Sequence, residues 1–206
     1  MPARGVLTGI GITGGMGSGK SSVAALLAES AGALSLSADC ICRDLLAPGG
    51  AGWLALRQAF GDRFLRADGT VDRPGLRTAL FADASLRHAL DALLHPLARE
   101  RVHAQVGEAL AAGKKVVVEV PLLYEAGWSE DFSRVVVVYA DASVCISRLA
   151  ARDRLSVEEA GKAIAAQLPL ADKAMRADHV IDNSGCWWET CLQVDRLRRQ
   201  LWPACG

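Results

Sequence analysis

The chain has 206 residues, of which 51% are hydrophobic and 22% are charged. This composition is typical of one globular domain, with or without a modest insertion, and it excludes disordered and fibrous proteins. The 23 lysines and arginines balance the 23 aspartates and glutamates, so the formal net charge is zero. We therefore expect no nucleic-acid partner, because nucleic-acid binding relies on excess positive charge.

The six cysteines include no Cys-x-x-Cys pair. We therefore expect thiols in a reducing compartment rather than a disulfide scaffold or a zinc site. No apolar run reaches the ~18 residues of a membrane span. The first apolar stretch is short and contains glycines, unlike a signal peptide. These features predict a cytoplasmic protein that does not insert into membranes.

The first predicted strand covers residues 6–12 and leads directly into a phosphate-binding motif. Residues 14–21 match the pattern Gly-x₄-Gly-Lys-Ser/Thr, and a helix is predicted over residues 22–30. Glycines allow backbone amides to surround phosphate oxygens, and the helix presents its positive N-terminus to the same anion. In this pattern Lys20 reaches the terminal phosphates and the hydroxyl of Ser21 ligates Mg²⁺. The sequence therefore predicts a nucleoside triphosphate site.

A second, weaker strand is predicted over residues 33–36, shortly before Asp39. The carboxyl ends of parallel strands open on one edge of a sheet, so we expect Asp39 to lie beside the phosphate loop. A carboxylate there can orient an accepting hydroxyl and take its proton. The alternative is that Asp39 only caps a helix over residues 40–47. Spacing alone leaves both interpretations open.

Roughly eighty residues separate the second and third predicted strands, where a crossover needs only about a dozen. Helices are predicted over residues 51–60 and 85–110, with turn signals at residues 48–50 and 67–69. This pattern predicts an inserted helical subdomain.

Three basic side chains in the insertion have two interpretations each. Arg73 and Arg77 lie four residues apart at the start of a helix after Pro74. They either contact a pyrophosphate or form an ordinary solvated surface. His95 lies between leucines and Pro96. A histidine in such a position is more often a packed structural residue than one that contacts a bound ligand.

The third and fourth predicted strands, residues 116–120 and 135–139, are nearly continuous β-branched runs. Such runs are typical of parallel strands that are covered on both faces. Glu119 interrupts the first run, and an unpaired buried carboxylate is costly. Glu119 therefore either acts near Mg²⁺ or reaches solvent at the end of the strand.

The next predicted helix, residues 143–154, carries Arg148 and Arg152 on one face, and Asp141 is positioned to cap it. Two guanidinium groups suit the charge of a transferring phosphoryl group, although a solvated face is the commoner meaning of such runs. The remaining elements are a helix over residues 157–168, a strand over 179–181 and a helix over 187–201.

Strands that alternate with helices predict an α/β fold with a parallel sheet and right-handed crossovers. The motifs together resemble the dephospho-coenzyme A kinase family over essentially the whole chain. This resemblance implies a P-loop NTPase core with a five-stranded parallel sheet, an inserted helical substrate subdomain and a helical lid. The residues that carry the resemblance are 7–9, 13–22, 37–39, 48–49, 93–96, 120–125, 148–153, 167 and 180–183.

The resemblance implies transfer of the γ-phosphoryl group of ATP to the ribose 3′-hydroxyl of dephospho-coenzyme A, with Mg²⁺ and without a protein partner. It implies catalytic roles for Asp39, Lys20, Arg148 and Arg152. Nucleotide contacts would come from Gly15, Met16, Gly17, Ser18, Gly19, Lys20, Ser21, Ser22, Arg152 and Asn183, with Ser21 on the metal. Substrate contacts would come from Asp39, Arg73, Arg77, His95, Leu122, Tyr124 and Gln167.

Two positions depart from the family pattern. Ser37 stands where the family often carries an acid, and Glu119 stands where it usually carries aspartate. Both departures concern the expected metal contacts.

The resemblance also divides the chain into a core, a helical substrate subdomain and a lid. The core covers about 1–47, 113–141 and 178–206, the subdomain about 48–112 and the lid about 142–177. Two alternatives stay open. One is a kinase of another small alcohol or a nucleoside monophosphate. The other is a nucleotide-dependent regulator, although the Asn-Lys-x-Asp guanine motif does not occur.

Overall fold

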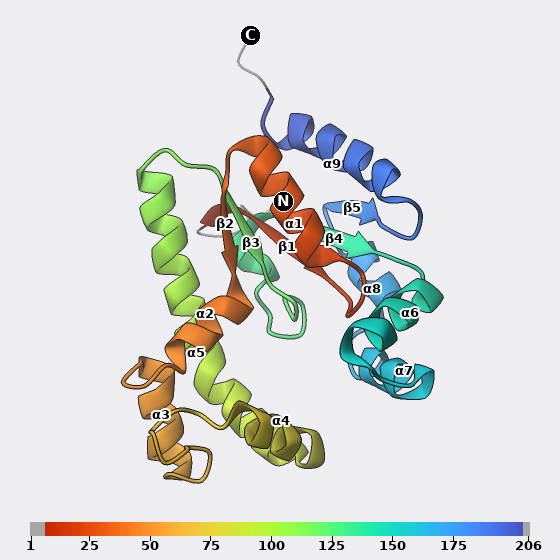
Figure 1. Ribbon diagram of the computed structural model, residues 1–206. Helices are drawn as coiled ribbons and strands as arrows, with labels where there is room; N and C mark the ends of the chain where they lie inside the picture. Colours follow the sequence, from red (N-terminus) through yellow and green to blue (C-terminus); the bar gives the residue numbers. More distant parts are fainter. Residues whose placement is uncertain (1–6, 204–206) are drawn as a thin grey trace. The chain divides into compact units, whose positions relative to one another are not determined.

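A computed structural model of the chain describes residues 7–203 (Figure 1). Val6, which was expected to open the first strand, lies outside the described residues. The chain divides into two compact units. The sheet unit comprises Met1–Ser37 and Val106–Gly206, and the helical unit comprises Ala38–Gln105.

Five parallel strands form the sheet, in the order β2-β3-β1-β4-β5. Each strand that the sequence predicted is present, which confirms the α/β class and the five-stranded parallel sheet. The strands are β1 (Leu7–Gly14), β2 (Leu34–Ser37), β3 (Val116–Glu119), β4 (Phe132–Tyr139) and β5 (His179–Asp182).

The central strand β1 lies between β3 and β4, with Ile12 paired to Glu119 on one side and to Val136 on the other. Close packing explains Gly11 in this strand. A Cβ atom there would lie 2.8 Å from the ring of Phe132. The carboxyl end of β1, where the phosphate loop begins, is therefore fixed by strands on both sides.

Two helices, α1 (Lys20–Ala31) and α9 (Trp187–Leu201), lie side by side on one face of the sheet (Figure 1). Burial of a side chain such as Leu27 contributes about 1.5–3 kcal/mol. The apolar core under these helices consists of Ile10, Ile12, Val23, Ala24, Leu27, Ala28, Val117, Val136, Val138, Ile181, Val194 and Leu197.

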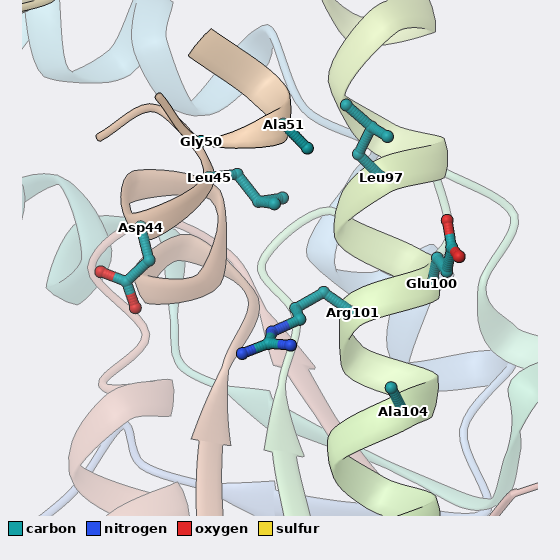
Figure 2. Close-up of a pocket in the computed structure, with 8 residues that line it drawn as sticks. All are labelled: Asp44, Leu45, Gly50, Ala51, Leu97, Glu100, Arg101 and Ala104. Carbon is teal, nitrogen blue, oxygen red and sulfur yellow. The ribbon is translucent and has the colours of Figure 1, made fainter. Parts of the chain in front are cut away.

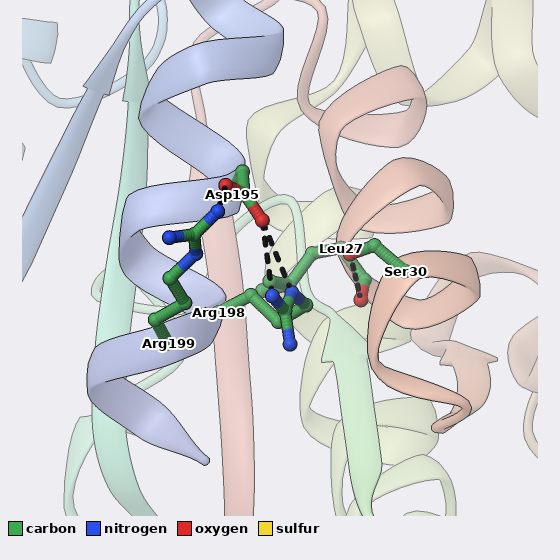
Figure 3. Close-up of polar contacts among 5 residues, drawn as sticks. All are labelled: Leu27, Ser30, Asp195, Arg198 and Arg199. Carbon is green, nitrogen blue, oxygen red and sulfur yellow. Dashed lines mark hydrogen bonds and ion pairs between the residues drawn. The ribbon is translucent and has the colours of Figure 1, made fainter. Parts of the chain in front are cut away.

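Two ion pairs lie along α9. Figure 3 shows Asp195 accepting hydrogen bonds from Arg198 and Arg199, at 3.1 and 2.6 Å. These bonds lower the pKa of the Asp195 carboxyl. On the neighbouring α1, the hydroxyl of Ser30 donates to the carbonyl of Leu27. Exposed pairs of this kind add little stability, so the apolar core holds α9 in place.

Three further helices follow β4 in the sheet unit: α6 (Ala142–Asp153), α7 (Val157–Ala165) and α8 (Leu170–Met175). The sequence did not predict α8, and α7 ends three residues before the predicted end. Asp141 occupies the N-cap position of α6, but its side chain makes no capping hydrogen bond, so the expected cap is wrong in that respect. A short 3₁₀ helix, Ser129–Asp131, precedes β4.

The helical unit has four helices and its own core. They are α2 (Ala38–Leu45), α3 (Ala51–Phe60), α4 (Arg73–Ala82) and α5 (Ala84–Ala111), the last of which continues into the sheet unit. Asp39 lies inside the first turn of α2 rather than at its N-cap, so the capping alternative is wrong. The core consists of Leu56, Phe64, Val71, Leu76, Leu86, Leu90 and Leu94.

None of the helices within residues 7–203 has the length and apolar character needed to cross a lipid bilayer. The 28-residue α5 has the length, but charged side chains are distributed along it.

Candidate active site

The phosphate loop joins β1 to α1 in a conformation that requires glycine at two positions. Gly17 and Gly19 have φ angles of 77° and 84°, in the region that only glycine occupies without strain. A Cβ atom on Gly17 would collide with the backbone carbonyl of Cys145 in α6, and one on Gly19 would collide with the amide of Asn183. Neighbouring elements therefore enclose the loop closely.

The predicted nucleotide-binding residues lie together at this turn. Lys20 is the first residue of α1 and is half-buried, while Ser21 and Ser22 are exposed in the same helical turn. The N-cap residue is Gly19, which has no side chain to compete for the first N–H groups of the helix. The loop and the helix N-terminus form an anion-binding surface. The loop part of the set is Gly15, Met16, Gly17, Ser18 and Gly19.

Asn183 fastens the loop from the end of β5. Its Nδ2 donates to the carbonyl of Ser18 at 2.8 Å, and its Oδ1 accepts from the hydroxyl of Thr190 at 2.9 Å. The residue is only 4% exposed. The Asn183 side chain therefore shapes the phosphate loop. Contact with the adenine of ATP stays a prediction.

Glu119, the last residue of β3, contacts the phosphate loop directly. The hydroxyl of Ser21 donates to its Oε1 at 2.6 Å. Parallel pairing sets Glu119 opposite Ile12 in β1 and opposite Ser37 in β2. The strand register therefore brings this carboxylate to the start of α1, where it remains partly exposed. A role near Mg²⁺ stays a prediction.

The two arginines of α6 have different surroundings. Arg148 is half-buried, and its Nη1 donates to the carbonyl of Asn183 at 3.0 Å, next to Gly19 of the loop. Arg152 is exposed and binds Asp153 through two hydrogen bonds of 2.8 and 3.0 Å. These bonds raise the pKa of Arg152. The structure thus places Arg148 at the loop and Arg152 four residues further along the helix.

Gln167 lies between α7 and α8 and touches the other side of the phosphate loop. Its Oε1 accepts a hydrogen bond from the backbone N–H of Met16 at 3.1 Å. Leu170, at the start of α8, packs against Gly15: its Cδ2 lies 3.4 Å from the position that a Cβ atom on Gly15 would take. The lid segment of the prediction is therefore in contact with the loop at this end.

Leu122 and Tyr124 lie in the turn that follows β3. Leu122 is exposed, whereas Tyr124 is 7% exposed and packs under the guanidinium of Arg176, 4.2 Å from the ring centroid. The hydroxyl of Thr13 in β1 donates to the carbonyl of Pro121 and fixes the start of this turn. Substrate contacts by Leu122 and Tyr124 stay predictions.

Two of the predicted residues of the helical unit lie on different helices. Asp39 is exposed in the first turn of α2. Burial, followed by the negative charges of Asp39 and Asp91, raises the pKa of the Cys42 thiol to about 11. His95 lies on α5, where its Nε2 is 3.7 Å from Asp91, one turn away. Substrate contacts by Asp39 and His95 stay predictions.

Arg73 extends from the first turn of α4 to α2. Its Nη2 donates to the carbonyl of Arg43 at 3.1 Å, and Nε of Arg43 donates to the carbonyl of Asp39 at 3.3 Å. Arg77 is exposed one turn further along α4. These contacts connect Arg73 to the helix that carries Asp39, although the sequence analysis did not single out Arg43.

A pocket of about 420 Å³ lies between α5 and the connection from α2 to α3, within the helical unit (Figure 2). Its charged residues are Asp44, Glu100 and Arg101, and its remaining lining consists of Leu45, Gly50, Ala51, Leu97 and Ala104. None of the predicted substrate residues lines it.

Within residues 7–203 the protein alone does not assemble three His, Cys, Asp or Glu side chains around a metal position. The donor set at the loop, a serine hydroxyl and one carboxylate in contact, consists of hard oxygen ligands. Mg²⁺ commonly uses one or two such ligands together with phosphate oxygens and water. The residues present therefore fit a magnesium ion that binds with a nucleotide.

Comparisons with known proteins agree with this geometry. A family model described as dephospho-CoA kinase matches residues 8–189. The chain is 43% identical to a dephospho-CoA kinase of Symbiobacterium thermophilum, covering 96% of this chain and 81% of the relative. It is 40% identical to one of Desulfotalea psychrophila, covering 93% and 98%. A crystal structure of a Thermus thermophilus protein superposes with a TM-score of 0.77 and 32% identity, covering 96% and 97%.

Proposed function

Since this chain belongs to the dephospho-CoA kinase family, we propose that it transfers the γ-phosphoryl group of ATP to the ribose 3′-hydroxyl of dephospho-CoA. The observation that carries the proposal is the hydrogen bond from the Ser21 hydroxyl to Glu119. This contact brings a carboxylate to the phosphate loop, beside the serine that the motif assigns to Mg²⁺. The assignment of dephospho-CoA as the acceptor rests on membership of the family.

ATP binds through the phosphate loop and the N-terminus of α1. The backbone N–H groups surround the phosphate oxygens, and the ammonium of Lys20 neutralises the terminal phosphates. Gly15, Met16, Gly17, Ser18 and Gly19 supply the loop, and Ser22 continues the same helical turn. Asn183 supports the loop through its bond to Ser18, and we expect it to contact the adenine base of ATP.

Ser21, with Glu119 in contact with its hydroxyl, would hold Mg²⁺ when ATP is bound. The ion would supply positive charge to offset the charge of the phosphates during transfer. Glutamate is longer than the aspartate of the family pattern, and its contact with Ser21 supports a role beside the metal.

Arg148 and Arg152 stabilise the charge that spreads over the transferring group. Arg148 already lies beside Asn183 and the loop. Arg152 forms an ion pair with Asp153. Exposed ion pairs contribute little free energy, so little is lost when Arg152 exchanges Asp153 for another anion. We propose that Arg152 leaves Asp153 for phosphate oxygens when the segment over residues 142–177 closes as a lid.

Asp39 orients the 3′-hydroxyl of the acceptor and accepts its proton as the phosphoryl group arrives. We propose that Asp39, His95, Arg73 and Arg77, which all belong to the helical unit, bind the acceptor. The proposed substrate subdomain covers residues 48–112, of which residues 106–112 belong to the sheet unit. We also propose that Leu122, Tyr124 and Gln167 contact the acceptor.

We propose a cytoplasmic location and no obligatory protein partner. The sparse cysteines and the absence of a Cys-x-x-Cys pair in the sequence support a reducing compartment.

The test is ADP release from Mg-ATP with a panel of acceptors: dephospho-CoA, adenosine, a nucleoside monophosphate and a small sugar. CoA itself serves as a matched control, because its 3′-position already carries phosphate. We expect ADP release that depends on dephospho-CoA and falls by about 10²-fold or more in Lys20→Ala. Release that requires a different acceptor, or no acceptor, would contradict the proposal.

A further inference from the structure

Lys173 in α8 is a fully buried lysine that the proposed mechanism does not use. Its side chain is 0% exposed, and its Nζ lies 2.7 Å from Oε1 of Glu125, in the turn after β3. No acceptor among the described residues forms an aligned hydrogen bond with this ammonium. Burial of an ammonium is costly and needs a close counter-charge, so Glu125 is what makes the position of Lys173 tolerable.

The same oxygen of Glu125 has a second task. It accepts a hydrogen bond from the backbone N–H of Leu168 at 3.2 Å. The Glu125 side chain is 22% exposed, so without Lys173 the carboxylate has a path to water. The ammonium therefore keeps Oε1 turned inward, toward Leu168.

Leu168 follows Gln167, whose side chain accepts from the N–H of Met16 in the phosphate loop. Two residues further on, Leu170 packs against Gly15 of the same loop. Gln167 and Leu170 thus contact the phosphate loop, while Leu168 and Lys173 contact Glu125.

We propose that the Lys173–Glu125 ion pair positions the phosphate loop for ATP. The pair holds the backbone at Leu168 in place. The adjacent Gln167 then keeps its hydrogen bond with the N–H of Met16, and this bond holds the loop in its binding conformation before the nucleotide arrives. Preorganisation of this kind raises affinity by removing an ordering cost from the binding step. Lys173 and Glu125 are positioning residues. The inference rests on the proposed function, because it requires that ATP bind at this loop.

Three variants separate positioning from simple stabilisation. Lys173→Met removes the ammonium with little change in volume. The double variant Lys173→Met/Glu125→Gln is uncharged but keeps an oxygen that can accept from Leu168. The double variant Lys173→Met/Glu125→Leu is also uncharged but has no acceptor. Replacing both members of a buried pair avoids the penalty of leaving one charge unpaired, so both double variants are suited to folding.

The exposed pair Arg199–Asp195 in α9, 2.6 Å apart, supplies the control. Arg199→Met likewise removes the cation of an ion pair, but at the surface of a helix to which the mechanism assigns no role. Its affinity for ATP is expected to equal that of the wild type.

The readouts are the dissociation constant for Mg-ATP by calorimetry, without acceptor, and amide hydrogen exchange at residues 15–17 without ATP. We expect Lys173→Met and the Leu double variant to bind ATP about tenfold more weakly. This is the change expected if the population of the binding-competent loop conformation falls to about a tenth. Exchange at residues 15–17 should be faster in both. The Gln double variant should recover both values.

Equal ATP affinity and equal exchange in the two double variants would overturn the inference, because the pair would then act only on stability. If Lys173→Met fails to fold, the comparison between the double variants still decides. A wild-type protein that does not bind Mg-ATP would instead contradict the proposed function, so the two failures are distinguishable.

Discussion

At the scale of single residues, the contact between Ser21 and Glu119 determines what the phosphate loop offers to a metal ion. The hydroxyl donates to the carboxylate at 2.6 Å, so its oxygen lone pairs remain directed away from Glu119. A cation that approaches the loop meets this oxygen and the negative charge of Glu119 together. Hard oxygen ligands of this kind suit Mg²⁺.

Glu119→Gln tests this assignment. The amide keeps the length of the side chain and can still accept from Ser21, but the charge is lost. We expect the Mg²⁺ concentration that gives half-maximal activity to rise by about tenfold, roughly the scale of an altered metal ligand environment, while the melting temperature stays near that of the wild type. Activity is measured across a Mg²⁺ titration.

Glu130→Gln is the control, because Glu130 is an exposed glutamate in the 3₁₀ helix before β4. It should leave the titration unchanged. If Glu119→Gln gives the same Mg²⁺ dependence as the wild type, Glu119 serves only to hold Ser21.

The sequence identified Lys20 and Ser21 because the motif places them in consecutive positions. It did not identify the partner of Ser21, since the contact joins residues 98 positions apart and depends on the strand register. Lys173 was missed for a different reason. Charged residues are expected at the surface, and nothing in the local pattern indicates that this one is buried against Glu125.

At the scale of elements, the segment from α6 to α8 is in contact with the phosphate loop at both ends but exposes much of α7. Arg154, between α6 and α7, has a left-handed φ of 56° and is the one non-glycine residue with positive φ in the described part of the chain. Such a conformation costs about 1–2 kcal/mol, which makes this junction a natural place for a change of backbone angle.

We predict that α7 moves onto bound nucleotide, because closure excludes water and prevents hydrolysis of ATP. Hydrogen exchange of residues 154–166 should slow when Mg-ATP and the acceptor are both present. The buried half of α9, around Val194 and Leu197, is the internal control and should not change. Protection of the phosphate loop with unchanged exchange in α7 would show that this segment is not a lid.

The sequence predicted β1, β3 and β4 from nearly continuous β-branched runs, which are typical of buried parallel strands. The two edge strands, β2 and β5, were weaker predictions because their apolar runs are short. Helix α3 was also predicted with its observed ends. The six-residue α8 was missed because it is too short to show a helical period, and it begins after Pro169. The start of α2 was misplaced because Asp39 is a good capping residue, yet the helix begins at Ala38, directly after the last residue of β2.

At the scale of the whole molecule, each of the two units has its own apolar core. The sheet unit carries the phosphate loop with Glu119, Arg148 and Asn183, and these contacts are visible in the structure. The helical unit carries Asp39, for which strand topology and family resemblance support the proposed role of base.

The most direct test of this account is the single-turnover transfer of the γ-phosphoryl group to dephospho-CoA by Asp39→Asn. The substitution preserves the size of a side chain that caps no helix and removes the group that accepts the proton. Asp44→Asn, an exposed change on the same helix, is the control. The account predicts unchanged ATP affinity and melting temperature, a loss of about 10²-fold or more in the transfer rate of Asp39→Asn, and a wild-type rate for Asp44→Asn. A wild-type transfer rate in Asp39→Asn would contradict it.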